Sequence, residues 1–167
     1  MPFELPDNLH PACGPIAWML GTWRGNGHGN YPSIEPFQFG QELIFTHDGR
    51  PFFHYMARSW VVDEQGEKVR EGAIETGFLR AKTDGEPGEV ELLLAHNTGI
   101  VEIWAGNAAD GKVEIVTDAI GRVEGAQEVT GGKRLYGNVE GELLYAYDMA
   151  AEGHELQSHT WARLQRA

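Results

Sequence analysis

Two histidines near the C-terminus are the residues of this chain best suited to bind a metal. His154 and His159 flank Glu155 in the arrangement H-E-x-x-x-H. Zinc proteases carry H-E-x-x-H on a helix, which is one residue shorter. In a strand, the odd separation of the two histidines would put them on opposite faces. The pair therefore does not predict a shared zinc site, and a structural zinc site would also lack cysteine ligands.

A glycine-rich stretch runs from Gly21 to Pro32. It places four glycines in nine residues, at positions 21, 25, 27 and 29, between Trp23 and Tyr31. The three alternate glycines leave one face of an extended segment without side chains. The pattern predicts a barrel strand that bends sharply or makes room for a flat ligand.

The same glycines do not indicate a nucleotide site. Their spacing is G-x-G-x-G rather than G-x-G-x-x-G, and Pro32 and Pro36 argue against a helix directly after them. A P-loop fails as well, because Gly132-Lys133 is followed by Arg134. No nucleophile elbow is present, so acyl transfer has no support.

Other candidate residues have ordinary structural interpretations. His96 is expected to be a turn residue before Asn97-Thr98-Gly99, and His28 is expected to face solvent at a bend. Several aromatic residues could either wall a porphyrin or belong to the core and the barrel seam. These are Trp23, Trp60, Trp104, Trp161, Tyr145 and Tyr147.

The elements that must position these residues are almost all strands. Residues 11–20 form the only plausible helix, and Phe37, Phe39, Leu43 and Phe45 then show a period of two. Hairpin-type pairs such as Asp110-Gly111 separate the later segments. Further strands are expected at 52–62, 71–82, 89–96, 100–105, 112–119, 125–137, 142–150 and 155–165.

About ten strands joined by short turns predict an all-β fold, an antiparallel up-and-down β-barrel with a short N-terminal helix. Closure would remove exposed edges, and a barrel wider than eight strands leaves interior room for a ligand. With 167 residues and no linker or repeat, residues 1–167 are expected to form a single domain.

Composition argues against several partners. The formal net charge of −12 and the pI of about 4.9 argue against nucleic acid and anionic membranes. The single cysteine, Cys13, cannot form an intramolecular disulfide, and no Cys-x-x-Cys-His would attach haem covalently. Neither a signal peptide nor a long apolar run is visible, so a cytoplasmic protein is expected.

The glycine-rich stretch also carries a resemblance. It matches the G-x-W-x-G-x-G-x-G-x-Y-P signature of the nitrobindins, small β-barrel haem proteins. Other segments resemble that family in the same order and extend the likeness over nearly the whole chain. They are Ile34-Glu35-Pro36-Phe37, Gly49-Arg50-Pro51-Phe52, Glu75-Thr76-Gly77-Phe78, Leu94-Ala95-His96-Asn97-Thr98-Gly99 and Leu156-Gln157-Ser158-His159.

The resemblance implies a ten-stranded barrel that holds one haem b per chain without a covalent bond. His159 stands where the family has its proximal iron ligand, so it would be both the metal ligand and the catalytic residue. The further cofactor-binding residues implied are Ser33, Gln127, Gly21, Trp23, Gly25 and Gly27. The activity implied is isomerisation of peroxynitrite to nitrate at ferric haem, with reversible nitric oxide binding, in a monomer or homodimer.

Two other functions remain open from the sequence. A wide barrel could carry an apolar small ligand without haem, or the protein could bind haem and nitric oxide as a carrier or sensor without turnover. Three departures from the family bear on the choice. Gln127 stands where relatives commonly have Lys, Ala73 where they often have His, and Ser33 where they often have Thr. Gln127 can hydrogen-bond a propionate but cannot pair with its charge.

Strand alternation conflicts with the proximal-ligand assignment. His159 shares a face with Trp161 and Arg163, whereas Ala162 and Leu164 lie on the other. A regular strand with its apolar face inward would put His159 outside the barrel. An inward His159 therefore requires the leucine-rich face to point outward, or a β-bulge.

Overall fold

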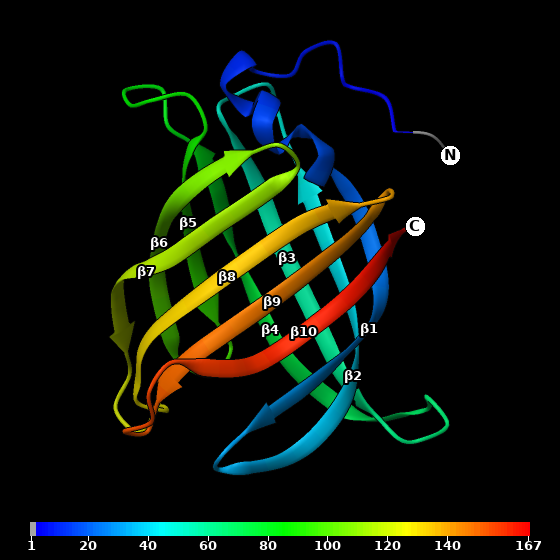
Figure 1. Cartoon of the computed structure of the whole chain (residues 1–167), viewed down its shortest axis with the longest axis vertical. Helices are drawn as coiled ribbons and strands as arrows, with labels where there is room; N and C mark the ends of the chain where they lie inside the picture. Colours follow the sequence, from blue (N-terminus) through cyan, green and yellow to red (C-terminus); the bar gives the residue numbers. More distant parts are fainter. Residues whose placement is uncertain (1–2) are drawn as a thin grey trace.

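Ten antiparallel strands close into one barrel (Figure 1). The structure, a computed structural model, describes residues 3–167. The elements are η1 (Pro11–Met19), β1 (Gly21–Tyr31), β2 (Ile34–Thr46), β3 (Phe52–Val62), β4 (Lys68–Ala81), β5 (Glu89–His96), β6 (Ile100–Ala109), β7 (Lys112–Arg122), β8 (Val129–Val139), β9 (Glu142–Ala151) and β10 (Gln157–Arg166).

Each strand pairs with its neighbours in sequence, and β1 pairs with β10 to complete the ring. At that seam Gly25 lies opposite Leu164 and Gly27 opposite Ala162. The predicted up-and-down barrel is therefore confirmed. The ranges of β3 and β5 are as predicted, whereas β6 extends beyond the expected residue 105 to Ala109.

Tight turns join several of the strands. Asp110 and Gly111 have φ angles of 52° and 73°, and Glu140 and Gly141 have 54° and 83°. Two successive positive φ angles fit the type I′ turn, whose twist matches that of the strands it joins. These two residue pairs in the sequence therefore do form the turns of β-hairpins.

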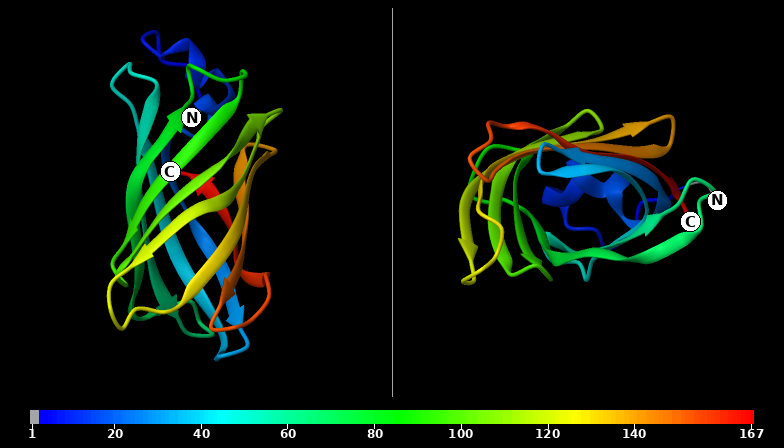
Figure 2. Two further views of the ribbon diagram at one scale, coloured as in Figure 1. Left: turned by 90° about the vertical axis from the view of Figure 1, so that its left-hand side faces the viewer. Right: turned by 90° about the horizontal axis from the view of Figure 1, so that it is seen from below.

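The 3₁₀ helix η1 closes one end of the barrel. It lies where residues 11–20 were expected to be helical, and Pro15 lies within it. Cys13, Ile16 and Met19 are buried in the main core. Seen from below, η1 lies across the far end of the lumen (Figure 2). No helix within residues 3–167 is long and apolar enough to cross a membrane.

Candidate functional site

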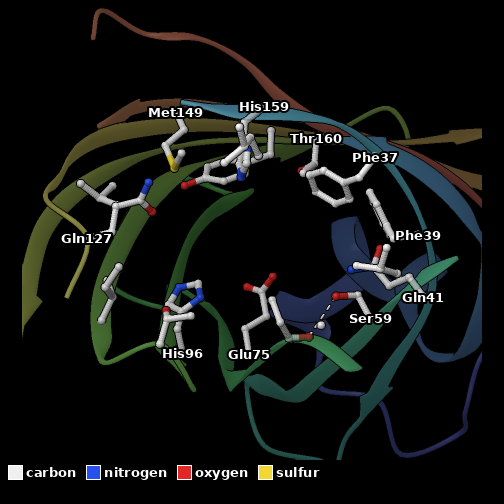
Figure 3. A pocket seen from close by; sticks show the side chains of 18 of the residues that line it. Phe37, Phe39, Gln41, Ser59, Glu75, His96, Gln127, Met149, His159 and Thr160 are labelled. Atoms are coloured by element: carbon white, nitrogen blue, oxygen red, sulfur yellow. Dashed lines mark hydrogen bonds between the residues drawn. The ribbon is translucent and has the colours of Figure 1, made fainter. Parts of the chain in front are cut away.

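A cavity of about 630 Å³ occupies the end of the lumen opposite η1. This volume lies within the range of small-molecule sites, roughly 300–1,000 Å³. Residues of β2 to β6 and β8 to β10 line it, together with the segment before β8. Aromatic and apolar side chains alternate around it with a few polar and charged ones (Figure 3).

His159 lines this cavity because β10 carries a bulge. Ser158 lies opposite Asp148 of β9, the next pair joins Thr160 to Tyr147, and the register shifts between them. As a result His159 and Thr160, although adjacent, both line the cavity. A bulge inserts one residue and re-aims the side chains next to it.

Beyond the bulge, β10 keeps normal alternation with its apolar face inward. Ala162 and Leu164 are buried, whereas Trp161 is exposed on the outer surface. Of the two arrangements that would bring His159 inward, the structure therefore has the bulge and not the reversed strand.

The imidazole of His159 is oriented by the backbone of the neighbouring strand. Its Nδ1 lies 3.0 Å from the carbonyl oxygen of Asn30, so Nδ1–H donates and Nε2 keeps its lone pair. Tyr31 and Tyr147 approach the ring edge-on, with centroids 5.4 and 5.6 Å away. Burial lowers the pKa of His159, and the bond to Asn30 opposes this only in part. A neutral, oriented imidazole is the form that binds a metal.

The glycines of β1 make room for aromatic rings of the protein itself. A Cβ atom on Gly27 would lie 2.4 Å from Cζ of Phe39, and one on Gly29 would lie 2.2 Å from Cζ of Phe37. Both phenylalanines come from β2 and line the cavity. The bare face predicted from the glycines is thus covered by these two rings, which form part of the cavity wall.

A buried histidine–carboxylate pair lies elsewhere on the cavity wall. His96 is the last residue of β5 and, as predicted, begins the turn that follows, since its carbonyl accepts the amide of Gly99 at 3.1 Å. Its side chain, however, lines the cavity. Its Nε2 hydrogen-bonds Oε1 of Glu102, a residue that is only 4% exposed. Trp104 Nε1 donates to the same oxygen at 3.4 Å. Burial alone would raise the pKa of Glu102, but the bond to His96 and the charge of Arg134 outweigh it and lower that pKa.

Arg134 also borders the cavity and is 6% exposed. Its Nη1 donates to both carboxylate oxygens of Glu75, at 3.1 and 2.9 Å, and to the hydroxyl of Tyr136 at 3.1 Å. The guanidinium also lies over the rings of Trp104 and Tyr147, 4.8 and 4.6 Å from their centroids. Burial would lower the pKa of Arg134, yet the charge of Glu75 holds it well above its usual value, so this buried cation stays charged.

Only some of the predicted site residues reach the cavity. Gln127 lines its mouth beside Met149, and Ala73 also borders it (Figure 3). Tyr145 and Tyr147 line it too and also pack against the main core. Trp161 stacks on His28 on the outer surface, where His28 was expected.

Five predicted cofactor-binding residues do not line the cavity, and one of them is Gly27, whose space is taken by Phe39. Gly21 and Trp23 lie next to η1, and Trp23 is fully buried there with its Nε1 donating to Met19 O at 2.8 Å. A Cβ on Gly25 would lie 2.2 Å from the backbone oxygen of Arg163, so this glycine serves the contact between β1 and β10. Ser33 is exposed in the turn between β1 and β2.

The sequence analysis did not identify His96, Glu102, Glu75 and Arg134 as site residues. A signal for His96 was present, because it continues the inward face of β5 formed by Val90, Leu92 and Leu94. Glu102 likewise lies between Ile100 and Trp104 on the inward face of β6. A charged residue on an otherwise apolar strand face points to a buried polar network.

The comparisons with known proteins agree with this architecture. The family described as "THAP4-like, heme-binding beta-barrel domain" matches residues 12–166. The chain belongs to this family. The resemblance to the nitrobindins is thereby confirmed over nearly the whole sequence.

Individual relatives cover the chain at full length. A protein of Nocardioides sp. named "Peroxynitrite isomerase" is 71% identical over 166 residues and 99% of each chain. A "Ferric nitrobindin-like protein" of Cutibacterium acnes is 42% identical over 100% of each chain. The crystal structure of Rv2717c from M. tuberculosis superposes with a TM-score of 0.84 at 37% identity, covering 95% of this chain and 99% of that one.

Proposed function

We propose that this protein binds haem b in the open end of its barrel through His159 and isomerises peroxynitrite to nitrate. The observation that carries the proposal is the bulge in β10, which turns His159 into the cavity. Membership of a heme-binding barrel family supports the cofactor. The names of the relatives that are 71% and 46% identical support the reaction.

The residues present fit a porphyrin. Asn30 fixes the tautomer of His159 and leaves Nε2 as the lone-pair donor. Phe37, Phe39 and Met149 supply flat or polarisable apolar surface on the cavity wall. The exposed Gln127 at the mouth can hydrogen-bond a propionate. With one cysteine, buried at the opposite end, the attachment would be non-covalent.

When bound, ferric haem would supply Lewis-acid polarisation that weakens the O–O bond of peroxynitrite. His159 would hold the group through Nε2. Tyr31 and Tyr147, which pack edge-on against its ring, would limit the access of water to that nitrogen. No protein nucleophile is required, in agreement with the absence of a recognisable nucleophile motif in the sequence.

The finer points of the proposal are one haem per chain, reversible binding of nitric oxide and a cytoplasmic location. The last rests on the single cysteine, and the first two on the family resemblance. A carrier of an apolar ligand without haem is the main competitor, since the cavity walls are partly apolar.

Hemin titration tests the cofactor. The parent should show a Soret band that saturates at one hemin per chain, and His159→Ala should lose or shift that band and weaken binding. His28→Ala is the matched control, because His28 lies on the outer surface. A His159→Ala spectrum and affinity equal to those of the parent would show that His159 is not the ligand.

Stopped-flow measurement of peroxynitrite decay tests the reaction. The hemin-loaded parent should accelerate decay and yield nitrate in stoichiometric amount, whereas the hemin-free protein should not. Hemin binding without acceleration would leave the protein as a haem or nitric oxide carrier. A protein that takes up fatty acids but no hemin would support the carrier of apolar ligands.

A further inference from the structure

The His96–Glu102 pair has the features of a ligand-binding dyad that the proposed function does not yet use. In Figure 3, His96 and Glu75 lie on one side of the cavity and His159, Thr160 and Met149 lie across the open space from them. The imidazole of His96 is thus on the wall that faces His159.

The protonation state of the dyad follows from its contacts. Glu102 is buried beside Arg134 and ionised at neutral pH, so its carboxylate can only accept hydrogen bonds. Nε2 of His96 must then carry the proton that it donates to Glu102. In the neutral ring, Nδ1 keeps a lone pair, and within residues 3–167 it has no hydrogen-bond partner.

An imidazole held in this way can take up one more proton without leaving an unbalanced charge. Protonation of Nδ1 would give an imidazolium next to a carboxylate, a pair that is neutral overall. The new N–H would then donate a charge-assisted hydrogen bond, which is shorter and stronger than a neutral one. A weak acid suits such a site, because it can give its proton to Nδ1 and then accept a hydrogen bond from it as an anion.

We infer that His96 is the residue that accepts the proton of an incoming weak acid and hydrogen-bonds the resulting anion on the wall opposite His159, with Glu102 as its positioning residue. This inference rests on the proposed function and extends it to the substrate. For peroxynitrous acid, the O–H bond breaks and an N–H bond forms at Nδ1 of His96. The anion rearranges to nitrate, and the proton passes from His96 to solvent as nitrate leaves.

Simple anions can test this role without turnover. Azide and fluoride bind ferric haem proteins as anions of weak acids, whereas imidazole binds as a neutral molecule. His96→Leu should weaken azide and fluoride about tenfold to a hundredfold, as expected for loss of a hydrogen bond to a charged group. Imidazole should bind within about threefold of the parent affinity or more tightly, since it delivers no proton and gains space.

Matched variants separate the role from general damage. His96→Gln should restore part of the affinity, because its amide can donate a hydrogen bond without taking up a proton. His96→Leu combined with Glu102→Gln removes the buried carboxylate that in His96→Leu alone would have lost its hydrogen bond to His96. His28→Leu changes a histidine on the outer surface and should leave all three affinities unchanged.

A second readout needs no haem. The ¹⁵N spectrum of the hemin-free protein should show His96 as the Nε2–H tautomer, and Glu102→Gln should weaken that preference while the fold is retained. A parent in which His96 is the Nδ1–H tautomer would overturn the inference.

The outcomes also separate this inference from the proposed function. If the parent binds hemin through His159 but His96→Leu leaves azide and fluoride affinities unchanged, the role of His96 is overturned and the proposed function stands. If the parent does not take up hemin, both the proposed function and the role of His96 are overturned. A selective loss of the two anions, with imidazole retained, supports both.

Discussion

The two ends of the barrel lumen are built from the same ten strands but filled differently. Next to η1, an internal space of only about 10 Å³ is bordered by side chains such as Met19, Phe45 and Leu92. At the other end the cavity is about 630 Å³. Strand number and pairing are common to both ends, so the difference comes from the side chains at the inward positions.

Those side chains divide clearly between the ends. Trp23, Phe53 and Leu143 are completely buried among other apolar groups. At the open end the inward positions include Glu102 and Arg134, which are buried only because they pair with neighbours. The end next to η1 therefore stabilises the fold by burying apolar side chains, whereas the interior of the open end also contains polar groups that can bind a ligand.

The largest expected effect on stability is at the end of the barrel that η1 closes. Trp23→Ala should lower the free energy of unfolding by about 3–5 kcal/mol, because it removes a fully buried ring and the bond from Nε1 to Met19. Urea unfolding measures this. Trp161→Ala is the matched control, since its side chain is 42% exposed on the outer surface, and it should cost about 0.5 kcal/mol.

Hemin affinity of the same variants sharpens the comparison. Under conditions where Trp23→Ala remains folded, its hemin affinity should match that of the parent, because Trp23 does not line the cavity. A parallel loss of stability and hemin affinity would mean that the two ends are coupled through the strands.

At the open end, removing one member of a buried ion pair should be almost as damaging. Arg134→Met leaves Glu75 without its cation and should cost about 3 kcal/mol, measured by urea unfolding. Adding Glu75→Gln should recover much of the loss. The control is Arg80→Met, which breaks the exposed pair with Glu91 and should cost less than about 1 kcal/mol. Equal costs for the two arginine variants would contradict the view that Arg134 is a buried charge held by its partner.

The fold could be predicted because its signals are local. Alternation of residues such as Phe37 and Phe39 and turn pairs such as Glu140-Gly141 act over a few residues, and β3 and β5 end where the pattern ends. The bulge before Thr160 could not be predicted in the same way. A single inserted residue reverses the faces of a strand, and its position depends on pairing with β9.

The site was harder to predict because neighbouring residues in the sequence do not show which end of the barrel a side chain will reach. Trp23 and Tyr31 belong to one motif, yet β1 carries the first to the packed end and the second to the open end. His96 was assigned only to the turn that it begins, although its side chain also continues the inward face of β5. The alternate glycines did signal a close approach, but the approaching groups are Phe37 and Phe39.

A smaller effect is expected from one hydroxyl at the open end. Tyr31 accepts the amide of Ala151 at 2.9 Å and donates to the carbonyl of Met149 at 3.1 Å. Tyr31→Phe leaves the buried Ala151 amide without a partner and should cost about 1–2 kcal/mol, whereas the ring beside His159 is kept. Hydrogen exchange should accelerate at the Ala151 amide more than at amides near η1. A uniform acceleration across the barrel would show that the hydroxyl acts on global stability and not on the open end.

The smallest effect concerns acid stability at the His96–Glu102 pair. The pKa of Glu102 in the folded state lies below its ordinary value of 4.5. The ionised carboxylate therefore stabilises the fold above pH 4.5, and this contribution is lost as the pH falls through the lowered folded-state pKa.

Glu102→Gln keeps an acceptor for His96 but has no such titration. The difference in unfolding free energy between parent and Glu102→Gln should be constant from pH 6 to about 5 and shrink below that. A difference that stays unchanged down to pH 3 would mean that Glu102 is not held as a carboxylate by its neighbours, and the dyad at the open end would lose the charge on which its anion binding depends.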